Sequence, residues 1–139
     1  MQDEVKQLPL DRLHRGPRGW GTNPIRAAGA GPEAAEALHL VSLRPGTSRG
    51  NHVHGNATEW LMVFGGACRI TWKSTRDGSL RESDFGGEGP VLYEIPARVE
   101  HVITNTSGKD IYALVFYDHP EPDTAPSEII PAGNKGGRP

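Results

Sequence analysis

RPGTSRGNHVHGNATEWLMVFGG, residues 44–66, is the stretch of sequence that decides the fold of this chain. It contains two short runs of strand-forming residues, 52–54 and 58–64, set among turns rich in Gly, Pro and Asn. β-Branched and aromatic residues favour strands, whereas Gly, Pro and Asn favour turns. Because no apolar period of about 3.6 residues runs through the stretch, it indicates strands rather than a helix.

Similar runs lie on both sides of this stretch, and turn signals such as FGG, GGEGP and TSGKD separate them. The strand-like runs cover residues 37–43, 52–54, 58–64, 67–72, 91–95, 101–105 and 111–117. The chain of 139 residues has 18 Gly and 12 Pro, which favours short strands and many turns over long helices. Closely spaced strands of this kind predict an all-β fold, a sandwich or a small barrel, rather than a parallel α/β sheet.

The length of the chain is typical of one domain, since domains cluster at roughly 100–150 residues. We expect the barrel to occupy residues 37–117. Residues 1–36 are rich in Gly, Pro, Ala and charge, and they predict an arm that lies along the barrel or along a partner subunit. Residues 118–139 form a Pro/Gly-rich C-terminal tail, for which the composition predicts an extended or disordered chain.

The charge balance excludes several classes of partner. There are 15 Lys and Arg against 17 Asp and Glu, and the formal net charge of −2 gives no basis for binding nucleic acid or an anionic membrane. No apolar run approaches the length of a membrane-spanning helix, and the start MQDEVKQLPL lacks the apolar segment of a signal peptide. The one cysteine, Cys68, cannot form an internal disulfide. These features predict a soluble, cytoplasmic protein.

A single charge interrupts an otherwise apolar strand. Alternation along residues 58–64 places Glu59 on the same face as Leu61 and Val63. The opposite face carries the large apolar side chains Trp60, Met62 and Phe64. An unpaired buried carboxylate costs several kcal/mol, so a cationic group is expected beside Glu59.

Histidines near Glu59 are the candidate partners. His52 and His54, at positions i and i+2 of a strand, point to the same face, so one cation can contact both imidazoles. The turn at residues 55–58 then presents Glu59 to that face, and His101 lies in a later strand-like run. Three imidazoles and one carboxylate suit a transition metal and leave open coordination positions, as a catalytic site requires.

These residues resemble the first motif of the cupin superfamily. The motif has a Gly, five residues, His-x-His, three or four residues, a Glu, six residues and a Gly. The chain matches every fixed position, with Gly46, His52, His54, Glu59 and Gly66. The resemblance therefore implies that these histidines and Glu59 are metal ligands.

The second cupin motif is a Gly followed by Pro-x-Gly-x-x-His-x-x-x-Asn. The chain matches it at Gly89, Pro96, His101 and Asn105, and His101 becomes the implied fourth metal ligand. Two departures concern the turn: Arg98 replaces the usual Gly, and one extra residue separates Gly89 from Pro96. They leave the geometry of this turn open.

The resemblance covers residues 37–117 and implies a small jelly-roll β-barrel. The RGNHVH segment, residues 49–54, is similar to that of small cupins in capsular and surface-polysaccharide synthesis. It implies a sugar or sugar-nucleotide isomerase or epimerase, in which a base removes a proton next to a carbonyl and an acid returns it. The implied cofactor is a divalent transition metal, Zn, Mn, Fe or Ni, which would polarise the carbonyl.

Two other functions remain open from the sequence. The same four ligands suit an iron-dependent dioxygenase, with oxygen and substrate sharing the open positions. A non-catalytic cupin that binds a small ligand or acts as a sensor is the third alternative. Because small barrels have sheet edges that invite pairing, a homodimer that exchanges arms or edge strands is also expected.

The catalytic residues are not fixed by the pattern, because the facing of their strands is not. The candidates are Tyr93, Glu94 and Tyr112, with Tyr117 as a further one; an inward-facing member would donate a proton or bind the substrate. His14, His39 and His119 are expected to have no special role at the site. A solvated or interface role is expected for Arg44, Arg49, Arg69 and Arg98, and the alternative for each is that it binds an anionic group of the substrate.

Overall fold

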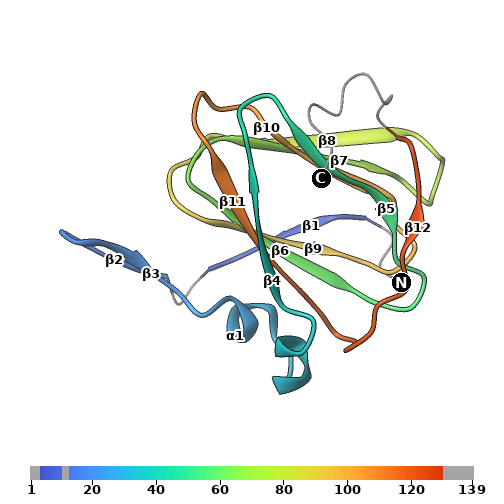
Figure 1. Cartoon of the computed structure of the whole chain (residues 1–139), viewed down its shortest axis with the longest axis horizontal. Coiled ribbons are helices and arrows are strands. Elements are labelled where there is room, and N and C mark those ends of the chain that lie inside the picture. Colours follow the sequence, from blue (N-terminus) through green and yellow to red (C-terminus); the bar gives the residue numbers. More distant parts are fainter. Residues whose placement is uncertain (1–3, 11–12, 130–139) are drawn as a thin grey trace.

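Two antiparallel sheets face each other in the computed structural model, which describes residues 4–10 and 13–129 (Figure 1). The first sheet has five strands in the order β1 (Lys6–Leu8), β9 (Val91–Ile95), β6 (Glu59–Phe64), β11 (Ile111–Tyr117) and β4 (His39–Leu43). The second has five strands in the order β12 (Ala125–Pro126), β5 (Ser48–Val53), β10 (His101–Asn105), β7 (Cys68–Lys73) and β8 (Leu80–Phe85). The predicted all-β jelly-roll fold is confirmed.

The strands agree closely with the strand-like runs of the sequence, and β9, β10 and β11 coincide with the predicted runs. Two strands differ. β5 begins at Ser48 rather than at His52, and β8, of sequence LRESDF, was not predicted. Charged side chains alternate along β8 because it is an edge strand with one face in water, so it lacks the apolar character of the inner strands.

Alternation along β6 divides the core into two layers. Leu61 and Val63 are buried between the two sheets, in the cluster that also contains side chains of β7, β9, β10 and β11. Trp60 and Met62 lie on the outer face of the first sheet, with Leu92 and Phe116 from its neighbours. The facing of this strand is therefore the one that its sequence predicts.

The N-terminal residues cover part of that outer face. β1 pairs with β9 at the edge of the first sheet, and α1 (Pro24–Ala28) and the 3₁₀ helix η1 (Pro32–Ala35) pack their apolar residues on the outer layer. Between them, β2 (His14–Gly16) and β3 (Gly19–Gly21) form a hairpin that projects from the sandwich (Figure 1). No helix in the described part of the chain has the length and apolar character needed to cross a membrane.

The turn of the second motif keeps its shape without the usual glycine. Arg98 adopts a left-handed backbone with φ 71°, a conformation that glycine adopts most readily. Its backbone N–H donates to the carbonyl of His54 at 2.7 Å, which ties this turn to the chain beside the first motif. The departure at Arg98 thus leaves the approach to His101 intact.

The chain after β11 returns to the second sheet. We call residues 118–129 the C-terminal strap. Its short strand β12 pairs with β5 at Val53 and His52, so the strap lies at the edge of that sheet. Residues 130–139 of the predicted tail lie outside the described residues.

Candidate metal centre

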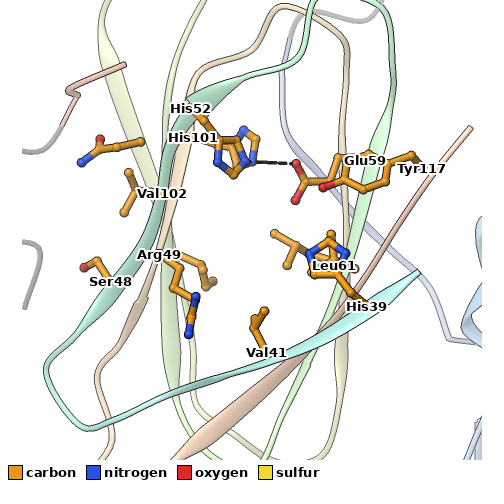
Figure 2. Close-up of a pocket in the computed structure, with 14 residues that line it drawn as sticks. His39, Val41, Ser48, Arg49, His52, Glu59, Leu61, His101, Val102 and Tyr117 are labelled. Atoms are coloured by element: carbon orange, nitrogen blue, oxygen red, sulfur yellow. Dashed lines mark ion pairs between the residues drawn. The ribbon is translucent and has the colours of Figure 1, made fainter. Parts of the chain in front are cut away.

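A cavity of about 360 Å³ lies between the two sheets and opens to solvent. Its walls are largely apolar, with Val41, Leu61, Val102, Ile103 and Val115 among the lining residues. Figure 2 shows His52, His101 and Glu59 at one end of the cavity and Arg49 with Val41 towards the other. The polar groups of the predicted site are therefore gathered at one end of an apolar chamber.

Strand pairing brings the predicted ligands to this end. His52 on β5 lies directly across from His101, the first residue of β10, while Glu59 begins β6 in the opposite sheet. One carboxylate oxygen of Glu59, Oε1, lies 2.9 Å from Nε2 of His54, 3.0 Å from that of His101 and 3.5 Å from that of His52. The four residues that the motifs single out meet at one point.

A β-bulge in β5 sets this register. Its partners step from His101↔His52 to Val102↔Gly50, so Asn51 is the extra residue. Gly50 has φ 109°, and a Cβ there would come within 2.7 Å of the His101 carbonyl oxygen. A glycine is required because the two backbones approach so closely, and this approach holds His52 opposite His101.

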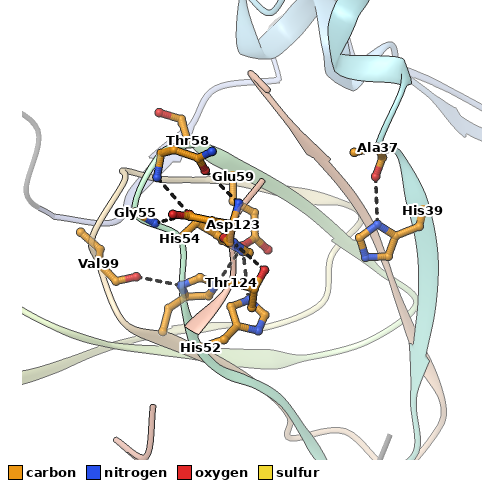
Figure 3. Close-up of polar contacts among 12 residues, drawn as sticks. Ala37, His39, His52, His54, Gly55, Thr58, Glu59, Val99, Asp123 and Thr124 are labelled. Carbon is orange, nitrogen blue, oxygen red and sulfur yellow. Dashed lines mark hydrogen bonds and ion pairs between the residues drawn. The ribbon is translucent and has the colours of Figure 1, made fainter. Parts of the chain in front are cut away.

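Backbone carbonyls determine which nitrogen of each buried ring carries the proton. Nδ1 of His54 lies 2.6 Å from the carbonyl oxygen of Asp123, and Nδ1 of His101 lies 3.0 Å from that of Val99 (Figure 3). A carbonyl only accepts, so both Nδ1 atoms donate. In each neutral ring the lone pair is then on Nε2, the atom that faces Glu59.

When His54 and His101 are neutral, their Nε2 atoms therefore bring no proton to Glu59. Apart from one another, Oε1 of Glu59 and the Nε2 atoms of the three histidines have no hydrogen-bond partner among the described residues. Glu59, His54 and His101 are at most 4% exposed, so water does not compensate them. Four acceptor atoms at such distances repel one another unless a proton or a metal ion lies among them.

The donor set fits a metal ion. Ligand atoms of His52, His54 and Glu59 all lie within 4.8 Å of one another, so this cluster can hold a metal. Atoms bound at right angles at about 2.1 Å from one ion are about 3.0 Å apart, close to the separations observed around Glu59. The neutral nitrogens and the carboxylate are the forms in which these groups bind metals.

Electrostatics keep Glu59 in the ionised form. Burial acts to raise the pKa of Glu59, but the charge and hydrogen bond of His101, with hydrogen bonds from His52 and His54, outweigh it. The pKa of Glu59 therefore lies well below its usual value of 4.5. Burial likewise acts to lower the pKa of His54, while Glu59 and the Asp123 carbonyl raise it above 6.5. Glu59 thus favours a proton on His54, and that proton would occupy the place of the metal's charge.

Further polar residues line the cavity, among them His39, which the sequence left out of the site, and Arg49 and Tyr117, which it considered as substrate-binding candidates. His39 is exposed at the end of β4, and its Nδ1 lies 3.0 Å from the Ala37 carbonyl, so Nε2 carries the lone pair. The rings of His39 and Tyr117 are stacked with centroids 6.2 Å apart. Arg49 donates from Nε to the Ser42 carbonyl at 2.8 Å.

Tyr117 lies beside Glu59, since the two residues are register partners in β11 and β6. Burial and the negative charge of Glu59 raise the pKa of the Tyr117 hydroxyl, which therefore stays protonated and can donate a proton. Strand facing was the missing signal: β11 is apolar on both faces, so its sequence does not show which tyrosine points inward.

The other catalytic candidates lie away from the cavity. Tyr93 is buried in the core, where its hydroxyl is 3.9 Å from the sulfur of Cys68. Glu94 accepts a hydrogen bond from the indole of Trp60 at 3.0 Å, on the outer face of the sheet. Tyr112 is 39% exposed. None of the three is among the residues that line the cavity.

Comparison with known proteins identifies the kind of domain. Residues 14–125 match the family model described as the polysaccharide biosynthesis C-terminal domain. No curated protein sequence matches the chain at a significant level.

Several solved structures share the fold. The capsular polysaccharide assembling protein CapF from Staphylococcus aureus matches with a TM-score of 0.59 and 24% identity, over 66% of this chain and 28% of that one. A mutant of the 3,4-ketoisomerase QdtA from Thermoanaerobacterium thermosaccharolyticum, in complex with TDP-4-keto-6-deoxyglucose, matches with a TM-score of 0.63 and 14% identity, over 86% and 83%. Oxalate decarboxylase from Bacillus subtilis, a protein with Mn(II) centres, matches with a TM-score of 0.54 and 26% identity, over 64% and 23%.

These matches differ in the length that they span. The present chain covers 28% of CapF but most of the ketoisomerase. At identities below 25%, the likeness to CapF and to the ketoisomerase establishes the common sandwich and not the reaction.

Proposed function

The chain belongs to the polysaccharide biosynthesis C-terminal domain family of cupins, and from this premise we propose that it is a metal-dependent isomerase or epimerase of a sugar or sugar nucleotide. The observation that carries the proposal is the buried cluster of three imidazole nitrogens and one carboxylate at the end of the cavity. The ketoisomerase that shares the fold over most of both chains supports it.

His52, His54, Glu59 and His101 would hold a divalent transition metal, Zn, Mn, Fe or Ni. When bound, the metal would supply a positive charge that stabilises a developing enolate oxygen on a keto sugar. The apolar walls of the cavity lower the polarity around the reacting carbons, which strengthens such an electrostatic effect.

Proton transfer falls to His39 and Tyr117. The unprotonated Nε2 of His39 removes the proton from the carbon next to the carbonyl and so becomes an imidazolium. In an epimerisation, solvent at the mouth of the cavity returns a proton to the same carbon from the other face, and His39 gives its own proton up to solvent. The Tyr117 hydroxyl, stacked beside His39, would hydrogen-bond the enolate oxygen. In an isomerisation, His39 returns its proton to the neighbouring carbon, and Tyr117 passes the hydroxyl proton between the two oxygens.

The size of the cavity indicates how much substrate it holds. About 360 Å³ lies near the lower end of the roughly 300–1,000 Å³ of ligand pockets. It suits a sugar ring, while the nucleotide of a sugar nucleotide would extend through the mouth. Arg49 lines the same cavity and is suited to an anionic or hydroxyl group of the substrate.

The test is deuterium exchange at the carbon next to the carbonyl. Metal-loaded protein is incubated with TDP-4-keto-6-deoxyglucose in heavy water, and the sugar is followed by proton NMR. We expect exchange with wild type, a rate lower by about 10²–10⁴-fold for His39→Asn, and little change for the exposed control Tyr112→Phe. Metal-loaded wild type without exchange above the protein-free rate, or His39→Asn with the wild-type rate, would refute the proposed reaction.

The same four donors favour a second candidate, an iron-dependent dioxygenase. Oxygen consumption by the Fe(II) protein with a small organic substrate, and no deuterium exchange into the sugar, would support it. Tight sugar binding with neither reaction would support the non-catalytic binding cupin.

A further inference from the structure

The C-terminal strap runs along the edge of the second sheet, beside the strand that carries His52. β12 pairs with Val53 and His52, and the backbone N–H of Ser127 donates to the Asn51 carbonyl at 2.8 Å. The N–H of Ile129 donates to Oδ1 of Asn51 at 3.1 Å. The strap is therefore bound along the segment that carries the first two histidines of the site.

Asp123 fixes the strap to the turn that follows His54. Its Oδ1 accepts the backbone N–H of Gly55 at 2.6 Å and that of Asn56 at 3.1 Å. In return, the N–H of Asp123 donates to Oδ1 of Asn56 at 2.9 Å. A Cβ on Gly55 would lie 3.0 Å from Oδ2 of Asp123, so the glycine leaves room for this close approach.

The same residue contacts the imidazole of His54. The carbonyl oxygen of Asp123 accepts from Nδ1 at 2.6 Å, and Oγ1 of Thr124 lies 3.1 Å from the same nitrogen (Figure 3). This contact joins residues that are 69 positions apart in the sequence. His101 differs, because its Nδ1 bonds to Val99, only two positions away on its own loop.

We propose that Asp123 is a positioning residue of the metal centre, which holds His54 in the Nδ1–H tautomer with the lone pair of Nε2 directed at the metal. This inference rests on the proposed metal site. Without the Asp123 carbonyl, Nδ1–H has no partner of equal quality, and the ring gains more by placing its proton on Nε2 and donating to Glu59 at 2.9 Å. That tautomer hydrogen-bonds two ligands to each other and blocks the metal.

A reciprocal effect follows. If docking of the strap strengthens metal binding, metal binding must strengthen docking of the strap to the same extent. The C-terminal strap would then be held more firmly in the metal-loaded protein. Docking of the strap and metal occupancy of the centre would therefore depend on each other.

The first measurement uses metal-free protein with ¹⁵N-labelled histidine at pH 9. We expect Nδ1 of His54 to carry the proton in wild type and in Asp123→Asn, whose amide oxygen still accepts from Gly55 and Asn56. Asp123→Ala keeps the backbone carbonyl but removes the carboxylate that fixes it against the turn at Gly55 and Asn56. The carbonyl should then move away from Nδ1 of His54, and the proton should move towards Nε2. The matched control, Glu121→Ala, removes a carboxylate from the same strap and should resemble wild type. A wild-type tautomer in Asp123→Ala would overturn the inference.

The second measurement is the affinity for Zn²⁺ in competition with a chelating dye. Asp123→Ala should bind about 10–100-fold more weakly than wild type, which is typical of losing the partner of a ligating histidine. Asp123→Asn should recover most of the loss, and Glu121→Ala should show none. Equal affinities for Asp123→Ala and Glu121→Ala would overturn the inference.

Proteolysis distinguishes this failure from failure of the metal site. A protease that cuts after Glu should cleave the strap at Glu128 more slowly when Zn²⁺ is bound, and His54→Ala should lose this protection. If wild type bound Zn²⁺ no better than His54→Ala, the metal site and its coupling to the strap would be refuted. The ¹⁵N chemical shifts of His54 in the metal-free protein would still show whether Asp123 positions the ring.

Discussion

Glu59 is 2% exposed, and three imidazole nitrogens lie within 3.5 Å of one of its oxygens. At the scale of residues, this carboxylate links the stability of the protein to its ligand. Ionised and buried, it destabilises the fold unless a cation neutralises it. A bound metal and a proton on His54 are the two cations within its reach, so they compete for the same site.

Glu59→Gln keeps the size of the side chain but removes its charge, so it should weaken metal binding without emptying the core. At pH 7.5, with metal at about 100 times its dissociation constant, wild type gains about 2.7 kcal/mol. A chelator should therefore lower the wild-type melting temperature by on the order of 10 °C and leave Glu59→Gln almost unchanged. The melting temperatures are measured by calorimetry after metal analysis. If the chelator lowered them equally in the two proteins, Glu59 would not contribute to metal binding.

The pH dependence of the metal-free protein follows from the direction of the two pKa shifts. The pKa of His54 is raised above 6.5, so its stabilisation is complete below that pH and is lost as the pH rises through the folded-state pKa. The pKa of Glu59 is lowered, so its stabilisation is present above 4.5 and is lost as the pH falls through its folded-state pKa. The pair therefore contributes most between about pH 4.5 and 6.5.

We expect the melting temperature of the metal-free protein to fall from pH 6 to pH 8.5 and that of His54→Gln to fall less. Added metal should restore the loss, so the metal-induced rise should be larger at pH 8.5 than at pH 5.5, where protons displace the metal. A metal-induced rise that is equal at both pH values would contradict the competition between proton and metal.

At the scale of elements, the bulge in β5 determines the geometry of the site. Gly50→Ala places a methyl group 2.7 Å from the His101 carbonyl at φ 109°, so the two strands must separate. The matched control is Gly46→Ala, which also has a positive φ of 77° but no atom within 4 Å of the new Cβ.

We expect Gly46→Ala to lose about 1–2 kcal/mol of unfolding free energy through backbone strain alone. Gly50→Ala should lose more, and it should also lose affinity for metal because His52 and His101 move apart. Urea unfolding and metal titration measure both effects. Equal losses in the two variants would show that the close approach at Gly50 is not needed.

The elements also show where sequence reasoning succeeds. His52, His54, Glu59 and His101 follow from spacing and alternation, because a charge within an apolar strand is a strong signal. Which residues of β4 and β11 point inward does not follow, because both strands carry apolar residues on both faces. The sequence therefore left His39 out of the site and could not choose Tyr117 among the candidate tyrosines. The contacts of Asp123 could not be predicted either, because they join residues far apart in the sequence and use its backbone carbonyl as well as its side chain. The composition of this segment predicts only an extended tail.

At the scale of the whole molecule, one apolar surface remains open. β4 is an edge strand of the first sheet, and on the outer face of that sheet Leu40 is 60% exposed and Tyr112 39% exposed. Trp20, from the projecting hairpin, is 39% exposed and packs edge-to-face on Phe64 beside them. An unpaired edge next to exposed aromatic side chains is typical of a pairing surface, and the homodimer remains our prediction.

We expect a dimer by light scattering at tens of micromolar. Leu40→Glu should shift it towards monomer, because it places a charge in the predicted interface. Leu80→Glu is the matched control, since Leu80 is 56% exposed on β8, the edge of the other sheet, and should leave the dimer intact. A monomeric wild type would contradict the prediction.

The central claim, that the four residues at the end of the cavity form a metal centre, is tested most directly by anomalous X-ray scattering. Crystals grown at pH 7.5 with Mn²⁺ are measured for wild type and for Glu59→Gln. The account predicts a wild-type peak at about 2.0–2.3 Å from Nε2 of the three histidines and from the Glu59 carboxylate, greatly reduced in the variant. Wild-type crystals that show Mn²⁺ only elsewhere, with Glu59 held by a protonated imidazole, would contradict it.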